Sequence, residues 1–210
     1  RTPSGGRAEL NPRTRLPHRS PPAKSPDTGV LGAAILQWSN PPPPPPRRGG
    51  NEDAFAGGFR VWEEDVELMQ RANFSFVGLG IFSWSWLEPA KGEYEFEWLD
   101  TIMDKLHAGG IAVDLATATA TPPPWLSAAH PEILPVDVDG HTLWPGSRQT
   151  WCPTSPVSRE YAVALTRQME TRYHEHPALA MWHVSNEYAC HNMPCYCDEC
   201  ASHFRTWRAR

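Results

Sequence analysis

The fold is decided by residues 180–210, which read AMWHVSNEYACHNMPCYCDECASHFRTWRAR. This stretch opens as a short apolar run that ends at Asn186-Glu187 and then passes through a cysteine cluster. It closes with apolar residues at near-helical spacing, among them Phe204 and Trp207. A buried strand that stops at a carboxylate and leads through a loop into a helix is how the catalytic edge of a parallel α/β barrel is built. We therefore expect the functional site at this strand end.

Apolar periodicity upstream predicts alternating helices and strands. The expected helices are residues 62–73, 98–106 and 157–175, with one more at the end of the chain, and the expected strands are 74–82, 111–118 and 179–185. This alternation implies right-handed crossovers and a parallel sheet. The loops after the strands are long and rich in Trp and Pro, which again places the site at the carboxyl ends of the strands.

Two local expectations concern the first part of this pattern. Glu63, Glu64 and Asp65 are expected in the first turn of the first helix, where the helix dipole favours negative charge. Residues 83–89, SWSWLEP, are expected to form a loop, because the residue before a proline is disfavoured in a helix.

The length of 210 residues is less than the roughly 250 of a full (β/α)8 barrel, so we expect α/β architecture in the form of a partial (β/α)8 TIM barrel. The sequence starts at Arg1 without a methionine and stops inside the last helical pattern, so we interpret it as part of a longer protein. Residues 59–210 are expected to form the catalytic domain. Residues 1–58 hold twelve of the 23 prolines and are expected to be disordered or polyproline-like, as a native extension or an aberrant segment.

The net charge of −5 conceals an asymmetry along the chain. Residues 1–50 carry eight Arg and Lys against Glu9 and Asp27, a net charge of +6, so the remainder carries −11. An acidic domain argues against a nucleic-acid surface. No apolar run approaches the roughly 18 residues of a membrane span, and residues 30–36 follow a poor signal-peptide start. We expect a cytoplasmic protein with neither nucleic acid nor membrane as partner.

Glu187 is the candidate general acid/base. A carboxylic acid flanked by aromatic residues, here Trp182 and Tyr188, can have its pKa raised enough to donate a proton near neutral pH. Asn186 beside it can donate a hydrogen bond to a substrate hydroxyl. An ordinary loop Asn-Glu pair is the open alternative.

Glycoside hydrolysis needs a second carboxylate, about 5–5.5 Å away for retention or about 6.5–9.5 Å for inversion. No second candidate stands at an equivalent strand end, because Asp114 lies in mid-strand and Glu88 precedes a proline. We expect the partner carboxylate to lie beyond Arg210.

Four of the five cysteines fall within eleven residues, a clustering that favours a metal site in a reducing compartment over a disulfide framework. Cys197-x-x-Cys200 lets two thiolates approach one ion, and Cys195 can join them. Cys152 is the expected fourth ligand, since neighbouring strand-to-helix loops meet on one face. Four cysteine ligands form a closed, structural zinc site, which would connect two loops and hold Glu187 in place.

Other assignments of these residues stay open. Cys190 and His191 compete as ligands, although Cys190 is more typical of a lone thiol, and a chance cluster or a redox pair would explain the cysteines without zinc. Arg148 is a candidate for binding a sugar hydroxyl or a carboxylate, with an ordinary surface arginine as the alternative. His183 is interpreted as a packed core residue, and the two histidines before Pro177 as structural.

These residues lie in stretches that resemble glycoside hydrolase family 42, the bacterial β-galactosidases with a zinc-binding cysteine cluster. The similarity is continuous from about Phe59 to Arg210. The matching stretches are VWEEDVELM, IFSWSWLEPAKGEYEFEWLD, GIAVDLATATATPPPWL, HPEILPVDVDG, GSRQTWCPTSPVSREY and WHVSNEYACHNMPCYCDECASHF.

The resemblance implies a (β/α)8 domain that hydrolyses terminal β-D-galactosides with retention, holds structural Zn²⁺ and assembles as a homotrimer. It assigns the acid/base to Glu187, substrate binding to Asn186 and Arg148, and the zinc ligands to Cys152, Cys195, Cys197 and Cys200.

Two departures from the family pattern matter. A proline tract stands before Trp62, where the first barrel strand and its Tyr-x-Pro-Glu-x-Trp-type loop belong, and the family's nucleophilic glutamate comes from a later strand. The chain therefore resembles roughly the first four βα units, and we expect it to be inactive alone. Two alternatives remain: a related retaining glycosidase such as an α-L-arabinopyranosidase, and a catalytically silent, zinc-stabilised carbohydrate-binding or scaffold protein.

Overall fold

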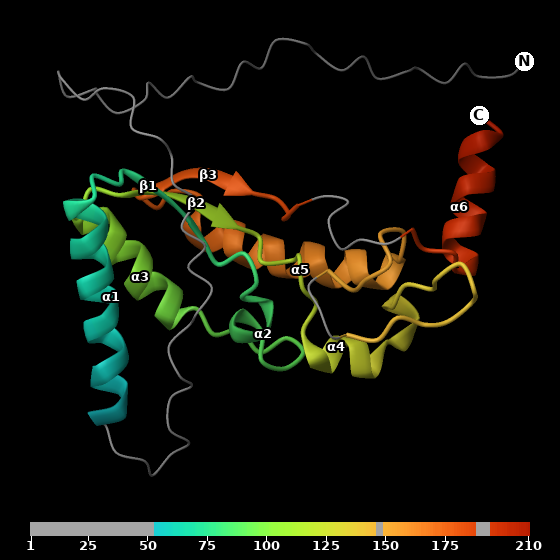
Figure 1. Ribbon diagram of the computed structural model, residues 1–210, viewed down its shortest axis with the longest axis horizontal. Coiled ribbons are helices and arrows are strands. Elements are labelled where there is room, and N and C mark those ends of the chain that lie inside the picture. The colour runs from blue at the N-terminus through green and yellow to red at the C-terminus, as the bar shows by residue number, and fades with distance from the viewer. Residues whose placement is uncertain (1–52, 146–148, 188–193) are drawn as a thin grey trace, which may run out of the picture. The chain divides into compact units, whose positions relative to one another are not determined.

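The computed structural model describes residues 53–145, 149–187 and 194–210. These residues contain a three-stranded sheet in the order β1-β2-β3, with both neighbouring pairs parallel (Figure 1). The strands are β1 (Phe76–Leu79), β2 (Ala112–Ala116) and β3 (Leu179–His183). The predicted α/β fold with a parallel sheet is confirmed. Each strand is shorter than predicted, and Gly80 (φ +78°) turns the chain directly after β1.

Three long helices lie on one side of the sheet (Figure 1). They are α1 (Asp53–Arg71), α3 (Glu97–Ala108) and α5 (Pro156–Tyr173). The predicted helices 98–106 and 157–175 are confirmed. The first helix begins earlier than predicted, so its three consecutive acidic residues lie inside it rather than in its first turn.

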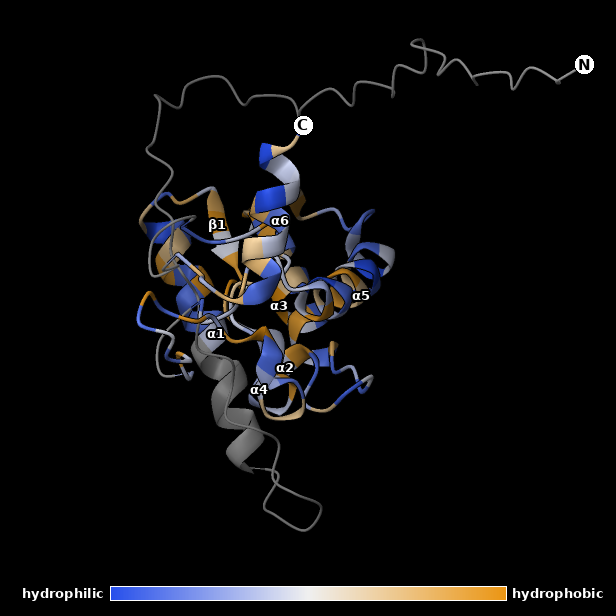
Figure 2. Ribbon diagram, turned by 90° about the vertical axis from the view of Figure 1, so that its right-hand side faces the viewer, coloured by the Kyte–Doolittle hydropathy of each residue, from blue (hydrophilic) through white to orange (hydrophobic). Residues whose placement is uncertain are grey.

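The hydrophobic core fills the space between these helices and the sheet, where the hydrophobic segments gather in Figure 2. Val77, Leu79, Val113 and Leu115 point into it from the strands, and each is at most 1% exposed. Burial of one such side chain contributes roughly 1.5–3 kcal/mol. The helix-covered face of the sheet is therefore the main source of stability in the described part of the chain.

A polar clamp joins α3 to α5 at the edge of this core. Arg172 donates from Nε to Asp100 Oδ1 at 2.7 Å and pairs through a second guanidinium nitrogen with Oδ2, and the Tyr173 hydroxyl donates to Asp100 Oδ1 at 2.8 Å. Burial would raise the pKa of the Asp100 carboxyl, but the hydrogen bonds from Arg172 and Tyr173 outweigh it and lower the pKa. Burial and the nearby carboxylate raise the pKa of the Tyr173 phenol.

The connections after β1 and β2 contain short helices, so the expectation of a loop at residues 83–89 was wrong. The short helices are α2 (Trp84–Leu87), α4 (Pro124–Ala129) and the 3₁₀ turn Pro131–Ile133. Glu88 explains why the first of them forms: its carboxylate accepts from Trp84 Nε1 and from the Gly92 amide, both at 2.9 Å, and its carbonyl accepts from Trp125 Nε1 at 2.8 Å. Two of these contacts are local and the third joins the connection after β1 to α4.

The last helix, α6 (Asp198–Arg208), confirms the prediction of a closing helix. Its apolar side chains are not buried by the described residues, since Phe204 is 58% and Trp207 is 70% exposed. The two rings pack on each other, with centroids 5.9 Å apart. α6 therefore presents an aromatic surface to solvent.

A β-bulge separates the two ends of β3. Val113 of β2 pairs with Leu179, but the next residue, Asp114, pairs with Met181, so Ala180 is an extra residue in β3. Leu179 and Trp182 both pack against the helix-covered core. Met181 and His183 lie with Asp114 on the opposite face of the sheet, on which Met181 is 53% exposed.

Candidate functional site

The carboxyl ends of β2 and β3 are tied together by the first residue after β2. The Thr117 amide donates to the His183 carbonyl at 3.0 Å, and the Thr117 hydroxyl donates to the Val184 carbonyl at 2.8 Å. Ala118 follows in the left-handed region (φ 59°) and is 1% exposed. Such a conformation costs an L-residue energy and marks a segment whose path the surrounding structure determines.

Asn186 and Glu187 lie directly beyond β3, at the edge where the sequence predicts them. Asn186 is 3% exposed, whereas the Glu187 side chain is exposed and its backbone is left-handed at φ 42°. Trp182 packs against the hydrophobic core, so it does not help the described residues to bury the Glu187 carboxyl. The aromatic pocket expected from sequence neighbours is therefore not formed by Trp182.

The loop before α5 reaches the same place. Gln149, which is 2% exposed, donates its side-chain amide to the Asn186 carbonyl. Trp151 Nε1 donates to the Ala120 carbonyl at 3.1 Å, which connects this loop to the loop after β2. A groove of about 580 Å³ opens beside this junction, with Trp151, Arg159 and Ser185 among its walls. The carboxyl edge of the sheet is thus bordered by an open, partly polar groove.

Four residues considered for the site lie outside the described residues, as do residues 1–52 of the segment expected to be disordered or polyproline-like. The four are the substrate-binding candidate Arg148, the aromatic neighbour Tyr188, and the competing metal ligands Cys190 and His191.

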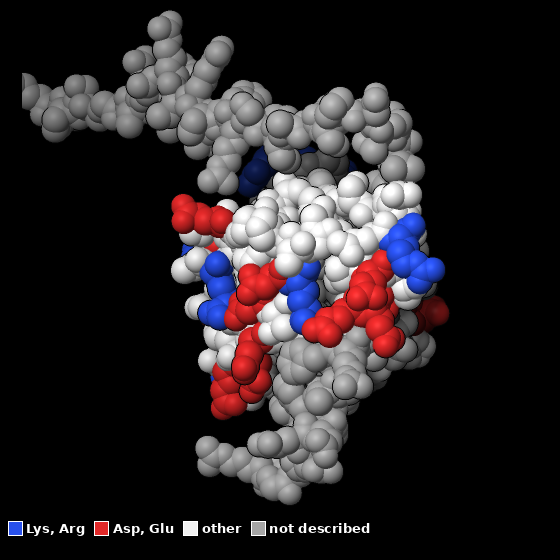
Figure 3. Space-filling model, turned by 90° about the vertical axis from the view of Figure 1, so that its left-hand side faces the viewer, with Lys and Arg blue, Asp and Glu red and all other residues white. Residues whose placement is uncertain are grey.

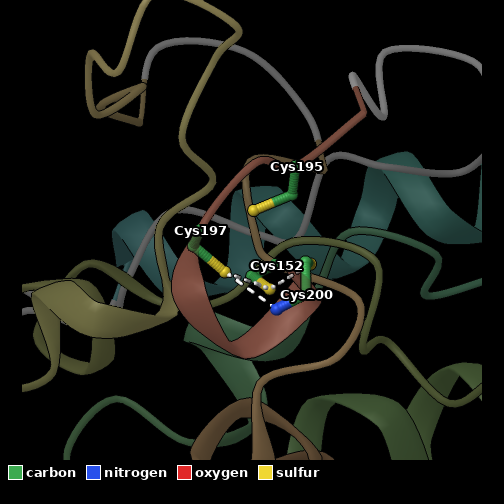
Figure 4. A group of neighbouring side chains, drawn as sticks. All are labelled: Cys152, Cys195, Cys197 and Cys200. Carbon is green, nitrogen blue, oxygen red and sulfur yellow. Dashed lines mark hydrogen bonds between the residues drawn. The ribbon is translucent and has the colours of Figure 1, made fainter. Parts of the chain in front are cut away.

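The four predicted metal ligands do come together in space (Figure 4). The sulfurs of Cys152, Cys195, Cys197 and Cys200 all lie within 4.8 Å of one another. Cys152 Sγ is 3.6 Å from Cys197 Sγ and 3.4 Å from Cys200 Sγ. Tetrahedral zinc with Zn–S bonds of about 2.3 Å holds its sulfurs about 3.8 Å apart, so the cluster has nearly the dimensions of such a site.

The protein environment gives these thiols unequal acidity. Burial raises the pKa of Cys152 and of Cys200. Burial also acts on Cys195, but there hydrogen bonds, first those from the backbone amides of Cys197 and Val136, outweigh it and lower the pKa. Buried thiols that lie so near one another favour the binding of a cation, because the cation stabilises them as thiolates. The cluster can hold a metal ion.

Two neighbours of the cluster were missed by sequence reasoning. The Thr154 hydroxyl lies 2.9 Å from Cys200 Sγ and 3.3 Å from Cys152 Sγ, and the Val136 amide donates to Cys195 Sγ at 3.4 Å. Such outer contacts orient metal ligands. Thr154 stands two residues from Cys152, which is the signal that sequence reasoning had available; Val136 comes from a distant turn and gives no such signal.

His183 differs from its predicted role as a packed core residue. Its Nδ1 lies 3.0 Å from Asp114 Oδ2 on the sheet face away from the helices, and Asp114 is 8% exposed. His183 Nε2 and Asp114 Oδ1 are buried without a hydrogen-bond partner among the described residues. The histidine is therefore part of a polar pair. The two histidines before Pro177 do make structural contacts: His174 with the Glu170 carbonyl and His176 with Asp104.

Within the described ranges, every helix is too short or too polar to cross a bilayer. On the face seen in Figure 3, basic and acidic side chains are interspersed, unlike the continuous basic surface that phosphate backbones require.

Fold and site together define the class of protein: an α/β protein with a polar site at the carboxyl edge of a parallel sheet. Residues 56–210 match the family model described as β-galactosidase, that of glycoside hydrolase family 42. The chain belongs to this family.

Individual relatives agree with the family match. A β-galactosidase of Arthrobacter sp. is 47% identical over 212 residues, which cover 100% of this chain and 29% of the relative. BbgII, a β-galactosidase of Bifidobacterium bifidum, is 53% identical over 147 residues, 70% of this chain and 21% of the relative. The solved β-galactosidase of Rahnella sp. R3 has a TM-score of 0.70 at 37% identity and covers 85% of this chain and 25% of that one. The chain thus spans about a quarter of the length of these relatives.

Proposed function

We propose that the whole protein is a cytoplasmic, retaining β-galactosidase and that this chain supplies about the first four βα units of its (β/α)8 barrel. The observation that carries the proposal is the position of Asn186-Glu187 at the carboxyl edge of the sheet in a chain of this family. In barrels of this kind the catalytic groups lie at that edge.

Glu187 is proposed as the general acid/base. In the first step it protonates the glycosidic oxygen of the leaving group, and in the second it removes a proton from the water that releases galactose. Its side chain is exposed, so substrate and water can reach it. Asn186 Nδ2 is buried without a hydrogen-bond partner among the described residues, which suits a donor to a sugar hydroxyl. Arg148 is proposed as a further substrate-binding residue on the family resemblance.

The nucleophile is proposed to come from another part of the whole protein. Retention needs a second carboxylate about 5–5.5 Å from the first. Glu88 is fully engaged by Trp84 and Gly92, and Asp114 is buried in β2 and paired with His183. These two carboxylates serve the structure, so we expect residues 1–210 alone to show no galactosidase turnover.

Zn²⁺ is the ion we propose for the cysteine cluster. Four thiolate ligands leave no open position on the ion, so it would serve as a structural cross-link rather than as a Lewis acid. Cys152 brings the loop that also carries Gln149, and the other three cysteines bring the segment that leads from Glu187 into α6. The cluster therefore fixes the two loops that flank the acid/base.

A homotrimer is proposed for the whole protein, as in the family it belongs to. The exposed rings of Phe204 and Trp207 on α6 form an apolar surface that a partner copy or the rest of the whole protein would cover.

The test uses the product of the whole gene and compares Glu187→Ala with an exposed glutamate on α1, Glu64→Gln, as control. We expect Glu187→Ala to lower kcat/KM for phenyl β-D-galactoside by roughly 100- to 10,000-fold, the usual contribution of a general acid. Azide should restore turnover of an activated galactoside and give β-galactosyl azide, because a small anion can replace the water that Glu187 activates. Glu64→Gln should retain full activity.

Two results would contradict the proposal. Equal activity of Glu187→Ala and the parent would exclude the acid/base role. A folded parent without any activity would favour the silent carbohydrate-binding or scaffold protein. Faster turnover of α-L-arabinopyranosides than of β-D-galactosides would reassign the substrate while leaving the role of Glu187 intact.

A further inference from the structure

Gln149 combines three properties that are rare in one surface-loop residue. Its backbone is left-handed at φ 61°, it is 2% exposed, and its side chain donates a hydrogen bond to the backbone carbonyl of Asn186. A non-glycine residue in this conformation is strained, and such strain persists where the surrounding structure over-determines the position. The side chain of Gln149 is therefore held in place rather than free to choose its partner.

The bonded carbonyl belongs to the peptide that joins Asn186 to Glu187. Glu187 is itself left-handed, at φ 42°. The orientation of that peptide group sets the direction in which the backbone enters Glu187, and hence where its side chain starts. One hydrogen bond thus connects two strained residues, Gln149 and Glu187, from segments far apart in the sequence.

The identity of the bonding atom is fixed by chemistry. A carbonyl oxygen accepts only from a donor, so the amide nitrogen of Gln149 must face Asn186. The Gln149 Oε1 atom is buried and has no partner among the described residues. Among the described residues, the side chain of Gln149 therefore hydrogen-bonds through its amide nitrogen to the Asn186 carbonyl.

We propose that Gln149 is a positioning residue for the acid/base: by holding the Asn186–Glu187 peptide, it aims the Glu187 carboxyl at the glycosidic oxygen. This inference rests on the proposed role of Glu187. Gln149 acts through its hydrogen bond to the Asn186 carbonyl, so its effect passes through the backbone. Misplacement of a catalytic group by about 1 Å can cost about a hundredfold in rate.

The consequence depends on the leaving group. A dinitrophenolate leaves without protonation, whereas a phenolate needs the general acid. A positioning defect at Glu187 should therefore slow phenyl β-D-galactoside much more than 2,4-dinitrophenyl β-D-galactoside. A general loss of folded protein or of sugar binding would slow both to the same extent.

The experiment compares Gln149→Met and Gln149→Glu in the product of the whole gene. Met keeps the length of the side chain and removes the donor. We expect Gln149→Met to lower kcat/KM for the phenyl substrate about 10- to 100-fold and for the dinitrophenyl substrate less than about threefold. The glutamate of Gln149→Glu can donate a hydrogen bond only when its carboxyl is protonated. Its kcat/KM for phenyl β-D-galactoside should therefore rise, relative to that of Gln149→Met, as the pH falls.

The matched control is Gln70→Met, the same substitution at a glutamine of α1 whose side-chain amide donates to another backbone carbonyl, that of Gly109, outside the groove. It should affect both substrates equally or not at all. Equal losses on the two substrates in Gln149→Met, or no loss on either, would overturn the positioning role. If Gln149→Met does not fold, the pH dependence of Gln149→Glu decides alone, and a flat ratio of the two substrates overturns the proposal.

The Glu187→Ala variant distinguishes failure of the positioning role of Gln149 from failure of the proposed function. If Glu187→Ala shows the leaving-group selectivity and Gln149→Met does not, only the role of Gln149 is wrong. If Glu187→Ala itself shows no selectivity, the acid/base assignment fails and the inference falls with it.

Discussion

β2 and β3 are neighbours in the sheet and equal in length, yet their surroundings differ. Four of the five residues of β2 are buried, whereas none of β3 is, and Met181 is 53% exposed. On the helix side both strands meet the same core. The difference arises on the opposite face and at the outer edge of β3. The core on the helix side is supplied by this chain itself, whereas the order of the site edge depends on loop contacts, polar bonds and the cysteine cluster.

Truncation of a core residue should produce the largest contrast between the two strands. Leu115→Ala in β2 should lower the free energy of unfolding by about 2–5 kcal/mol, because it removes contacts and leaves a cavity. Met181→Ala in β3 should cost less than about 1 kcal/mol, because that side chain is half exposed. Denaturant unfolding of the 210-residue chain measures both, because the half exposure of Met181 belongs to this chain and the rest of the proposed barrel would cover that face of the sheet. Similar losses of unfolding free energy for the two substitutions would show that the two strands do not differ in this way.

Removal of the metal should act on the site edge and spare the core. If free zinc is about a hundred times its Kd, its loss withdraws about 2.7 kcal/mol of stabilisation. Chelation or Cys200→Ser should abolish bound zinc and speed hydrogen exchange in the loops around Cys152 and Cys197, while β2 amides stay protected. Cys190→Ser is the control and should retain one zinc per chain. Loss of zinc from that control would show that the ligand set is wrong.

The clamp between α3 and α5 should have a smaller effect on the core side. Asp100→Asn removes the charge that Arg172 and Tyr173 share, and we expect it to cost about 1 kcal/mol, since the pair is partly exposed. Asp104→Asn on the same helix should change stability by less than about 0.5 kcal/mol, because that side chain is 80% exposed. Thermal unfolding of both variants tests this ranking. An equal shift in Tm would show that the contacts of Asp100 do not stabilise the packing of α3 against α5.

The smallest effect concerns acid stability. The pKa of Asp100 is lowered in the folded protein, so its contribution is fully present above its unfolded pKa of about 3.9 and is lost as the pH falls through the folded pKa. Asp100→Asn should therefore destabilise the protein at neutral pH and show a shallower loss of stability below about pH 4. Unfolding curves across that range check the sign. A variant with an unchanged slope would mean that other carboxylates dominate acid unfolding.

The same contrast explains which features the sequence revealed. α3, α5 and β2 were predictable because their apolar residues recur at the period of the element that buries them. α2 and α4 were missed because hydrogen bonds to Glu88, a local one from Trp84 and a long-range one from Trp125, help to form them. Periodicity does not report such contacts.

The candidate site divides in a similar way. The cysteines were recognisable because residue type and spacing already specify metal chemistry. Trp182 stands close to Glu187 in sequence but packs on the core face, so adjacency along the chain did not predict its position. Gln149 carried no signal at all, because its importance lies in a backbone conformation and in one contact with a carbonyl.

The bulge in β3 has a consequence for how the site tolerates change. Side chains alternate along a strand, so a single additional residue reverses the phase of every position after it. Ala180 supplies that residue opposite the step from Val113 to Asp114. If Ala180 instead paired with Asp114, His183 would turn toward the helices; deletion of Ala180 would leave Met181 opposite Asp114 and keep His183 on its present face. The bulge at Ala180, rather than strict alternation along the chain, thus decides which faces Trp182 and His183 occupy.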